Sequence, residues 1–207
     1  MFKINQLKIN ELINIKYKDI KNKENLEGYN IENENIKLNS NIEINACKFN
    51  GVIFDKVNIK FSTIEDVEFI NCDLSNISFI NTSLFRVKFL NCKLFGTNFI
   101  DCNINDIFIN DCMCNLINIT SNKIKNVKLL NSNLKESTIM NCNIKNIILD
   151  NINFSYSEII NTPLKGIDLS NSNIEAIKTD LSSIKGMIIN RYQSIDLIGM
   201  LGVKIKE

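Results

Sequence analysis

The amino-acid sequence repeats with a period of five residues over most of its length. Every fifth residue from Ile44 to Ile174 is apolar, which makes 27 consecutive positions without an insertion or a deletion. Because only 44% of the chain is apolar, chance does not produce such a run. A second ladder, two residues before each of these positions, holds small or β-branched residues from Ile42 to Ser172, with Asn122 as the exception. The other three positions of each five are mostly polar.

A period of five fits neither an α-helix, which repeats every 3.6 residues, nor a free β-strand, which repeats every two. It fits a chain that turns a corner every five residues, so that four sides make one square coil. Large apolar residues then fill the axis, and successive coils stack through β-type hydrogen bonds about 4.8 Å apart. The residues expected on the axis include Leu74, Phe79, Leu84, Phe89, Leu94 and Phe99.

Two segments carry a resemblance to a known family. Residues 71–75 (Asn-Cys-Asp-Leu-Ser) and 91–95 (Asn-Cys-Lys-Leu-Phe) resemble the consensus of the pentapeptide-repeat family, which runs small-polar-Leu/Phe-polar-x. The resemblance covers at least residues 42–176 and implies an all-β fold, a right-handed quadrilateral β-helix. A fold shared by many proteins says little about function by itself.

Residues 1–41 do not hold the frame of the repeat. Leu7, Leu12 and Tyr17 are five residues apart, but the later apolar residues of this region follow another phase. We therefore expect one or two irregular coils here, with exposed polar loops near residues 19–25 and 37–41. The alternative is a partly disordered N-terminus. The regular β-helix is expected over residues 42–189.

The repeat fades after Ile174, and residues 190–207 have a different pattern. We expect Asn190 to cap a helix over residues 191–201, followed by a short strand over residues 203–205. One side of this helix should cover the open end of the β-helix, and the other should meet a second copy about a twofold axis. The expected dimer interface consists of Tyr192, Ile195, Leu197, Ile198 and Leu201.

Residues 181–206 also resemble the C-terminal ending of the Qnr and microcin-immunity branch of this family. That resemblance implies tail-to-tail dimers that bind DNA gyrase or topoisomerase IV and protect it from quinolones or peptide gyrase poisons, in a fold described as a mimic of duplex DNA. Qnr coils carry loops, whereas residues 42–176 have no interruption, so a partner-contact loop is expected upstream. The candidate loop consists of Ile20, Lys21, Asn22, Lys23, Glu24 and Asn25.

Composition excludes several classes of function. The chain has no His, which removes His-based acid–base chemistry and His metal sites. Its net charge of +1 gives no reason to expect direct binding to nucleic acid. All seven cysteines lie at inward positions, where packing explains them better than metal binding or disulfides, and Cys112-Met-Cys114 is a weak zinc signal without a second pair. We therefore expect no catalytic residues, no metal, no cofactor and no enzyme activity.

Outward charges are nearly balanced, with 14 acidic and 12 basic residues between Glu43 and Ala176. One side carries its acids early, including Glu65, Asp66 and Asp106, and its lysines later. The simple interpretation is a solvated surface, and the alternative is a dipolar surface with a specific partner. Stacked Asn residues at five-residue corners are expected to have a structural role.

These patterns predict a cytoplasmic, homodimeric protein that protects DNA gyrase or topoisomerase IV. The start of the chain lacks the apolar stretch of a signal peptide, and no apolar run is long enough to cross a membrane. The alternative is a scaffold or protein-binding module of the same fold with an unknown partner and no gyrase role. The near-neutral charge favours this alternative, and the C-terminal ending favours the first.

Overall fold

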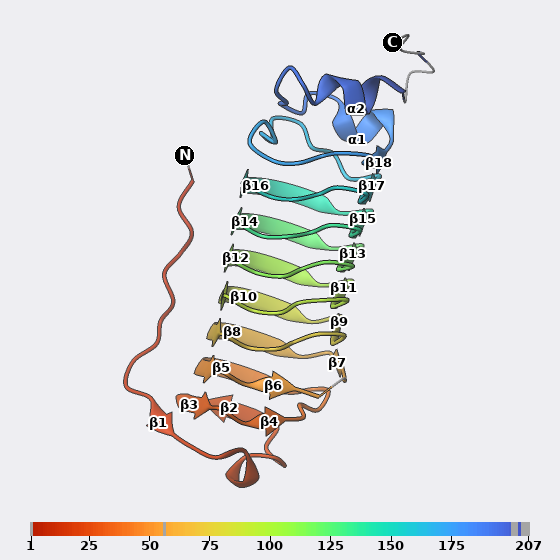
Figure 1. Ribbon diagram of the computed structural model, residues 1–207. Helices are drawn as coiled ribbons and strands as arrows, with labels where there is room; N and C mark the ends of the chain where they lie inside the picture. Colours follow the sequence, from red (N-terminus) through yellow and green to blue (C-terminus); the bar gives the residue numbers. More distant parts are fainter. Residues whose placement is uncertain (1, 56, 200–202, 204–207) are drawn as a thin grey trace.

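The computed structural model describes residues 2–55, 57–199 and 203. The chain forms a rod of stacked coils, with an N-terminal segment along one side and two short helices at the C-terminal end (Figure 1). Strands of neighbouring coils pair in parallel, and paired residues in the regular part are 20 apart in the sequence, as in Leu84 with Ile104. The predicted all-β solenoid is therefore confirmed. No helix in the described part of the chain is long and apolar enough to cross a membrane.

Two sides of each regular coil are formed by one long strand that bends in its middle. These strands stack in one parallel sheet, with β1, β2 and β3 at its N-terminal end. The long strands are β5 (Glu43–Asn50), β8 (Thr63–Ile70), β10 (Ser83–Leu90), β12 (Asn103–Asn110), β14 (Lys123–Leu130) and β16 (Asn143–Asp150). The N-terminal members are β1 (Ile13–Asn14), β2 (Asn25–Glu27) and β3 (Tyr29–Glu32).

The other two sides are formed by shorter segments. One is a second parallel sheet of β7 (Asn58–Lys60), β9 (Ser78–Ile80), β11 (Asn98–Ile100), β13 (Asn118–Thr120), β15 (Thr138–Met140), β17 (Glu158–Ile160) and β18 (Lys178–Thr179). The other begins with β4 (Asn35–Ile36) paired to β6 (Ile53–Phe54). It continues as single bridges every 20 residues from Ile53 to Asn173.

The corners explain the five-residue period. Most corner residues have a positive φ, as at Asn71, Asn91 and Asn131. Asn and Asp tolerate this left-handed conformation better than other non-glycine residues. The amides also bond between coils: Asn91 Nδ2 donates to Asn71 Oδ1 at 2.7 Å, and Asn151 Nδ2 donates to Asn131 Oδ1 at 3.0 Å. The stacked Asn residues therefore have a structural role, since they form the corners and link neighbouring coils.

The core lies on the rod axis. The six residues from Leu74 to Phe99 that were expected there are all buried, with Phe99 the most exposed at 7%. Phe69 stacks between Phe49 and Phe89, with ring centroids 5.2 and 5.0 Å away. Asn122, the polar exception in the small-residue ladder, is buried but bonded, since its Oδ1 accepts from the Cys102 N–H and its Nδ2 donates to the Phe99 carbonyl.

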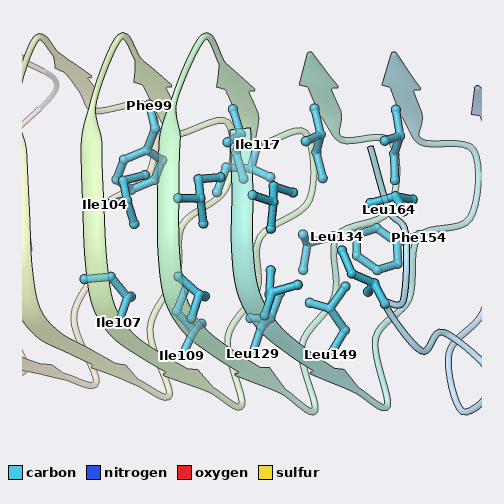
Figure 2. A pocket seen from close by; sticks show the side chains of 18 of the residues that line it. Phe99, Ile104, Ile107, Ile109, Ile117, Leu129, Leu134, Leu149, Phe154 and Leu164 are labelled. Atoms are coloured by element: carbon cyan, nitrogen blue, oxygen red, sulfur yellow. The ribbon is translucent and has the colours of Figure 1, made fainter. Parts of the chain in front are cut away.

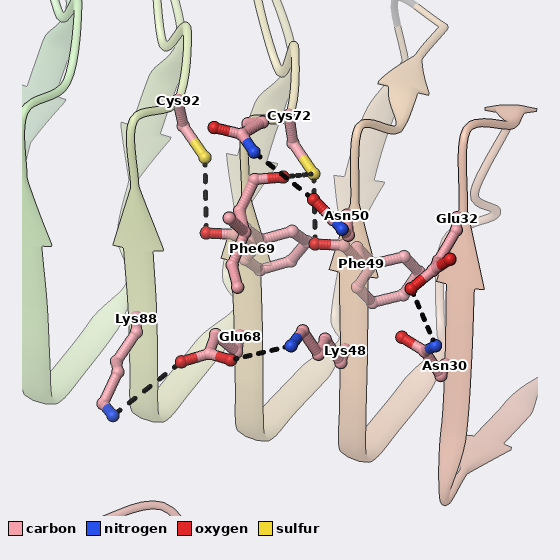
Figure 3. A network of polar contacts seen from close by, with 12 residues as sticks. Asn30, Glu32, Lys48, Phe49, Asn50, Glu68, Phe69, Cys72, Lys88 and Cys92 are labelled. Carbon is pink, nitrogen blue, oxygen red and sulfur yellow. Dashed lines mark hydrogen bonds and ion pairs between the residues drawn. The ribbon is translucent and has the colours of Figure 1, made fainter. Parts of the chain in front are cut away.

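The seven cysteines are buried and free. The Cys72 and Cys92 Sγ atoms donate to carbonyl oxygens of the preceding coil, at 3.4 Å in each case (Figure 3). Burial raises the pKa of Cys47 and of Cys102 to about 11, so both remain thiols at neutral pH. Cysteine in this chain acts as a small packing residue.

From residue 13 onward the N-terminus agrees with the expectation of irregular coils. Residues 25–36 form a coil through β2, β3 and β4, and β1 pairs with β3 on its outer side, with paired residues 16 or 18 apart instead of 20. Residues 2–12, however, run as an extended segment along the outside of the rod, beside the long strands (Figure 1). We call residues 2–12 the N-terminal strap. The spacing of Leu7 and Leu12 reflects half-buried contacts on the rod's outer surface rather than an inward ladder.

The C-terminal end also differs from the expectation. A four-residue helix, α1 (Leu181–Ile184), was not predicted; Asp180 caps it by accepting from the Ser183 N–H. The expected helix over residues 191–201 is shorter, because α2 spans only Ser194–Ile198. Asn190 Oδ1 accepts from Tyr192 and Gln193 N–H groups, so it caps the turn before α2 and not the helix itself. Val203 is exposed and outside any strand, and residues 201, 204 and 205 lie outside the described residues.

Candidate partner-binding surfaces

The C-terminal end presents a group of exposed apolar side chains. We call residues 181–199, which include α1 and α2, the C-terminal cap. Leu181 is 57% exposed, Ile188 47%, Tyr192 79% and Ile195 63%. Burial of such side chains is favourable by about 25 cal/mol per Å² of apolar surface. The cap is therefore a surface that a second protein chain would stabilise.

The cap divides the expected dimer residues between two surroundings. Tyr192 and Ile195 point to solvent, whereas Leu197 is half-buried and packs against the core of the rod. Ile198 is also half-buried, and Leu201 lies outside the described residues. The helix thus has an inner side that covers the last coil and an outer side that is open.

Gln193 fastens the cap to the rod, a role that the sequence did not indicate. Its side chain is buried, and Nε2 donates to the carbonyls of Leu169 at 2.8 Å and Ser172 at 2.6 Å. Its Oε1 accepts from the Asn190 N–H at 2.7 Å. These carbonyls belong to the last turns of the repeat, on which residues 186–188 add only a short paired segment. Gln193 therefore satisfies part of the open end.

The expected partner-contact loop is only partly exposed. Ile20 is 3% exposed and belongs to the core, so its assignment as a contact residue is wrong. Residues 21–24 form an exposed turn, and Asn25 begins β2. Within the turn, Lys23 Nζ donates to the Tyr29 hydroxyl at 2.7 Å and lies 4.9 Å from its ring centroid. The surface available to a partner is thus residues 21–24 together with Asn25, which is exposed at the start of β2.

The strongest electrostatic feature is a buried corner column that consists of Asp66, Arg86 and Asp106. These residues occupy the same corner of three successive coils and are 4%, 6% and 2% exposed. Arg86 Nε and Nη2 each donate to Asp66 at 2.6 Å, and Nη2 also reaches Glu65 at 2.5 Å. The expectation of a solvated surface is wrong at this corner.

The N-terminal strap covers the corner column. The Asn5 N–H and Nδ2 donate to the two oxygens of Asp106 at 3.2 and 2.9 Å. The Lys8 N–H donates to Asp66 Oδ1 at 2.8 Å. Asn5 and Lys8 are three residues apart, which is about 10 Å in an extended chain, and Asp106 and Asp66 are two coils apart, which is about 9.6 Å. The two spacings match, so each carboxylate has a donor of the strap opposite it.

Hydrogen bonding keeps Asp66 and Arg86 ionised. Desolvation raises the pKa of Asp66, but the Arg86 side chain and the Lys8 backbone outweigh it and hold that pKa below its usual value. The same contact with Asp66 raises the pKa of Arg86. Asp106 has no such cation in direct contact among the described residues and is held by Asn5 and by Asn126 Nδ2 at 3.2 Å. The strap is therefore part of what makes the buried charges tolerable.

The neighbouring side of the rod carries a second, more exposed charge pattern. Glu68 lies between Lys48 and Lys88 of the adjacent coils, with N–O separations of 3.9 and 3.8 Å (Figure 3). Pairs this exposed contribute little to stability. They do make the surface electrostatically mixed, so this side is not an extended acidic surface.

The arrangement offers no evident chemistry. Among the described residues, no group of three His, Cys, Asp or Glu side chains is placed to hold a metal ion. The column's carboxylates are engaged by Arg86 and the strap rather than facing a cleft. The exposed features among the described residues are the apolar cap and the turn at residues 21–24.

A sequence comparison matches part of the repeat to a family model. Residues 42–119 match the family model described as "Pentapeptide repeat region". No curated protein sequence matches the chain. Similar solved structures include a trypsin-treated variant of QnrB1, a plasmid-mediated fluoroquinolone resistance protein, with 18% identity and a TM-score of 0.49 over 96% of this chain and 99% of that one.

A second similar structure is HetL, a pentapeptide repeat protein involved in heterocyst differentiation regulation from the cyanobacterium Nostoc sp. strain PCC 7120. It has 15% identity and a TM-score of 0.49, over 80% of this chain and 85% of that one. At these levels of similarity neither structure carries a function over to this chain. The family match stands on the sequence, and the left-handed corners continue at five-residue steps beyond it as far as Gly166. Residues 42–119 therefore form a pentapeptide repeat region by sequence, and the coil geometry continues beyond them.

Proposed function

We propose that this protein is a non-enzymatic homodimer that binds DNA gyrase or topoisomerase IV and protects it from quinolones or peptide gyrase poisons. In this proposal the rod competes for the DNA-binding surface of the enzyme. The observation that carries it is the apolar outer side of the C-terminal cap, where Tyr192 and Ile195 are 79% and 63% exposed. The likeness of residues 181–206 to the ending of the topoisomerase-protecting branch supports the choice of target.

A twofold axis through the cap gives the dimer its shape. Because the cap lies at one end of the rod, pairing two caps sets the rods end to end (Figure 1). Each copy then covers the exposed side chains of the other, and each substitution in the interface appears twice. Gln193 supports such pairing, since it holds the cap against the last coil through two carbonyls.

One observation favours a second candidate function, a scaffold that binds another protein. Neither of the two charged surfaces described above is an extended acidic side: Lys48, Glu68 and Lys88 alternate, and the acids of the corner column lie beneath the strap. A mimic of DNA would gain from exposed negative charge, because electrostatic complementarity speeds and orients association. A scaffold function does not require an acidic surface. The gyrase proposal, without such a surface, depends on the shape of the rod and on contacts of the exposed turn.

A supercoiling assay tests the proposal. We expect the protein to restore DNA supercoiling by gyrase in the presence of ciprofloxacin, and the double variant Tyr192→Glu/Ile195→Glu to remain folded, become a monomer in light scattering and lose rescue. Met113→Glu is the matched control, since Met113 is also an exposed apolar residue, at 53%, but lies on a coil side away from the cap. If the wild type is a dimer and does not rescue supercoiling, the gyrase role is contradicted and the scaffold function remains as the candidate. If the wild type is a monomer at tens of micromolar, the proposed dimer is contradicted.

A further inference from the structure

The rod axis changes in composition halfway along its length. In the first regular coils, phenylalanine fills the axis: Phe49, Phe69 and Phe89 stack on one side, and Phe79 stacks on Phe99 at 5.0 Å on another. The following positions of these two columns are aliphatic. They are Ile109, Leu129 and Leu149 in the first column, and Ile119, Ile139 and Ile159 in the second.

The backbone does not shrink to match these smaller side chains. Parallel pairing keeps the same 20-residue register from β8 through β16, so each coil has the same four sides of five residues. An aromatic ring is replaced by a branched aliphatic chain inside an unchanged frame. The axis is therefore underfilled where the phenylalanines stop, because native interiors are otherwise close-packed.

A cavity lies at this place. It has a volume of about 100 Å³, and its lining side chains converge on the axis between the strands (Figure 2). Ile104, Ile109 and Leu149 point inward but are only half-buried, whereas Ile64 and Phe69, at comparable positions of an earlier coil, are 0% and 1% exposed. The residual exposure of these inward residues belongs to the cavity that they line.

The chemistry of the lining selects the ligand. Every lining residue is Leu, Ile, Val or Phe, so the described residues offer a bound molecule no hydrogen-bonding side chain. A buried water needs two to four polar partners, and apolar cavities that lack them stay dry and take up apolar molecules such as xenon or benzene. The engineered cavity that shows this behaviour has about 150 Å³, so the volume here suits a somewhat smaller guest.

We propose that this axis cavity is a binding site for a small, uncharged, apolar molecule of the size of xenon or a short hydrocarbon. The site lies inside the coils between Leu84 and Leu169, on the rod axis. The inference does not depend on the gyrase role, because it rests on core volume alone.

Xenon is the probe, and methyl NMR of the full-length protein is the measurement. Saturating xenon should shift the Ile109, Ile119 and Leu129 methyl signals of the wild type, with no comparable shift at Ile44 and Ile59, which lie outside the lining. Unmoved cavity methyls at saturating pressure, or equal shifts in the early coils, would overturn the proposal.

Two variants distinguish filling of the cavity from general disruption of the fold. Leu129→Phe extends the phenylalanine stack into the cavity and should weaken xenon binding at least tenfold. Leu130→Phe is the matched control, since it makes the same change at the next residue of β14, at an outward position, and should leave binding unchanged. If Leu129→Phe does not fold, Ile109→Phe, one coil earlier, provides the same filling. Undiminished xenon shifts in a folded filled variant contradict the site.

Discussion

Replacing Arg86 with methionine tests whether the buried corner column is a coupled unit. Methionine keeps much of the volume and flexibility of the side chain but removes the bonds to Asp66 and Glu65. The Arg86 and Asp66 side chains are 7% and 5% exposed, so Asp66 is left as an uncompensated buried charge. Removing one partner of a buried pair typically costs 3–5 kcal/mol, and we expect about 3 kcal/mol here, since Lys8 still donates to Asp66.

The pH dependence of this loss has a definite sign. In the wild type the pKa of Asp66 is lowered, so the carboxylate contributes stability above its unfolded pKa of about 3.9, and this contribution is lost as the pH falls through the lower folded value. Without Arg86, desolvation dominates and raises that pKa, so the carboxylate is destabilising at neutral pH. Protonation of Asp66 then removes the buried charge from the variant. The difference in the free energy of unfolding between the wild type and Arg86→Met therefore becomes smaller toward pH 4.

Thermal unfolding followed by circular dichroism measures both effects. At pH 7 we expect Arg86→Met to lower the melting temperature by about 6–12 °C, from about 2–4 °C per kcal/mol for a chain of this size. The double variant Asp66→Asn/Arg86→Met is the control, because it removes both charges and should recover most of the loss. A single variant within about 0.5 kcal/mol of the wild type at pH 7, or a gap that is unchanged at pH 4, would refute the reasoning.

Three other perturbations address the axis, the strap and the exposed turn. Leu94→Asp places an unpaired charge on the axis, where Leu94 is 0% exposed, and should give insoluble protein or loss of the β-sheet signal; unchanged melting would contradict the repeat frame. Deleting residues 2–9 removes the strap's donors to Asp66 and Asp106 and should lower the free energy of unfolding, measured by chemical denaturation, by about 3 kcal/mol. An unchanged free energy of unfolding would contradict binding of the strap to the rod. Shortening the turn at residues 21–24 should reduce gyrase rescue but keep the melting temperature within a few degrees, and full rescue would move the contact to the coil sides.

The regular part of the fold could be predicted because its signals are local. An apolar residue at every fifth position defines the inward direction, and Asn or Asp at the corner accepts the left-handed conformation, as at Asn71 and Asn91. Both features are visible within one short window of sequence. The axis cavity was missed for the same reason: Ile109 and Phe89 satisfy an apolar position equally well, although their volumes differ.

The strap and the cap could not be predicted in detail because their contacts are distant in sequence. Asn5 and Asp106 are 101 residues apart, and Lys8 and Asp66 are 58 apart. The available signal was weak: three corner residues of alternating charge, 20 residues apart, and an N-terminal stretch that alternates apolar and polar residues. Gln193 likewise looks like an ordinary polar residue until its carbonyl partners are known.

The most direct test of the proposed function is competition with DNA for gyrase. Fluorescence anisotropy of a labelled duplex bound to the reconstituted enzyme would be followed as this protein is added. We predict that the duplex is displaced and that the monomeric Tyr192→Glu/Ile195→Glu variant displaces it far less well, because it lacks the paired rods. A duplex that stays fully bound at saturating concentrations of the dimeric wild type would contradict the proposal that the rod protects the enzyme by occupying its DNA-binding surface.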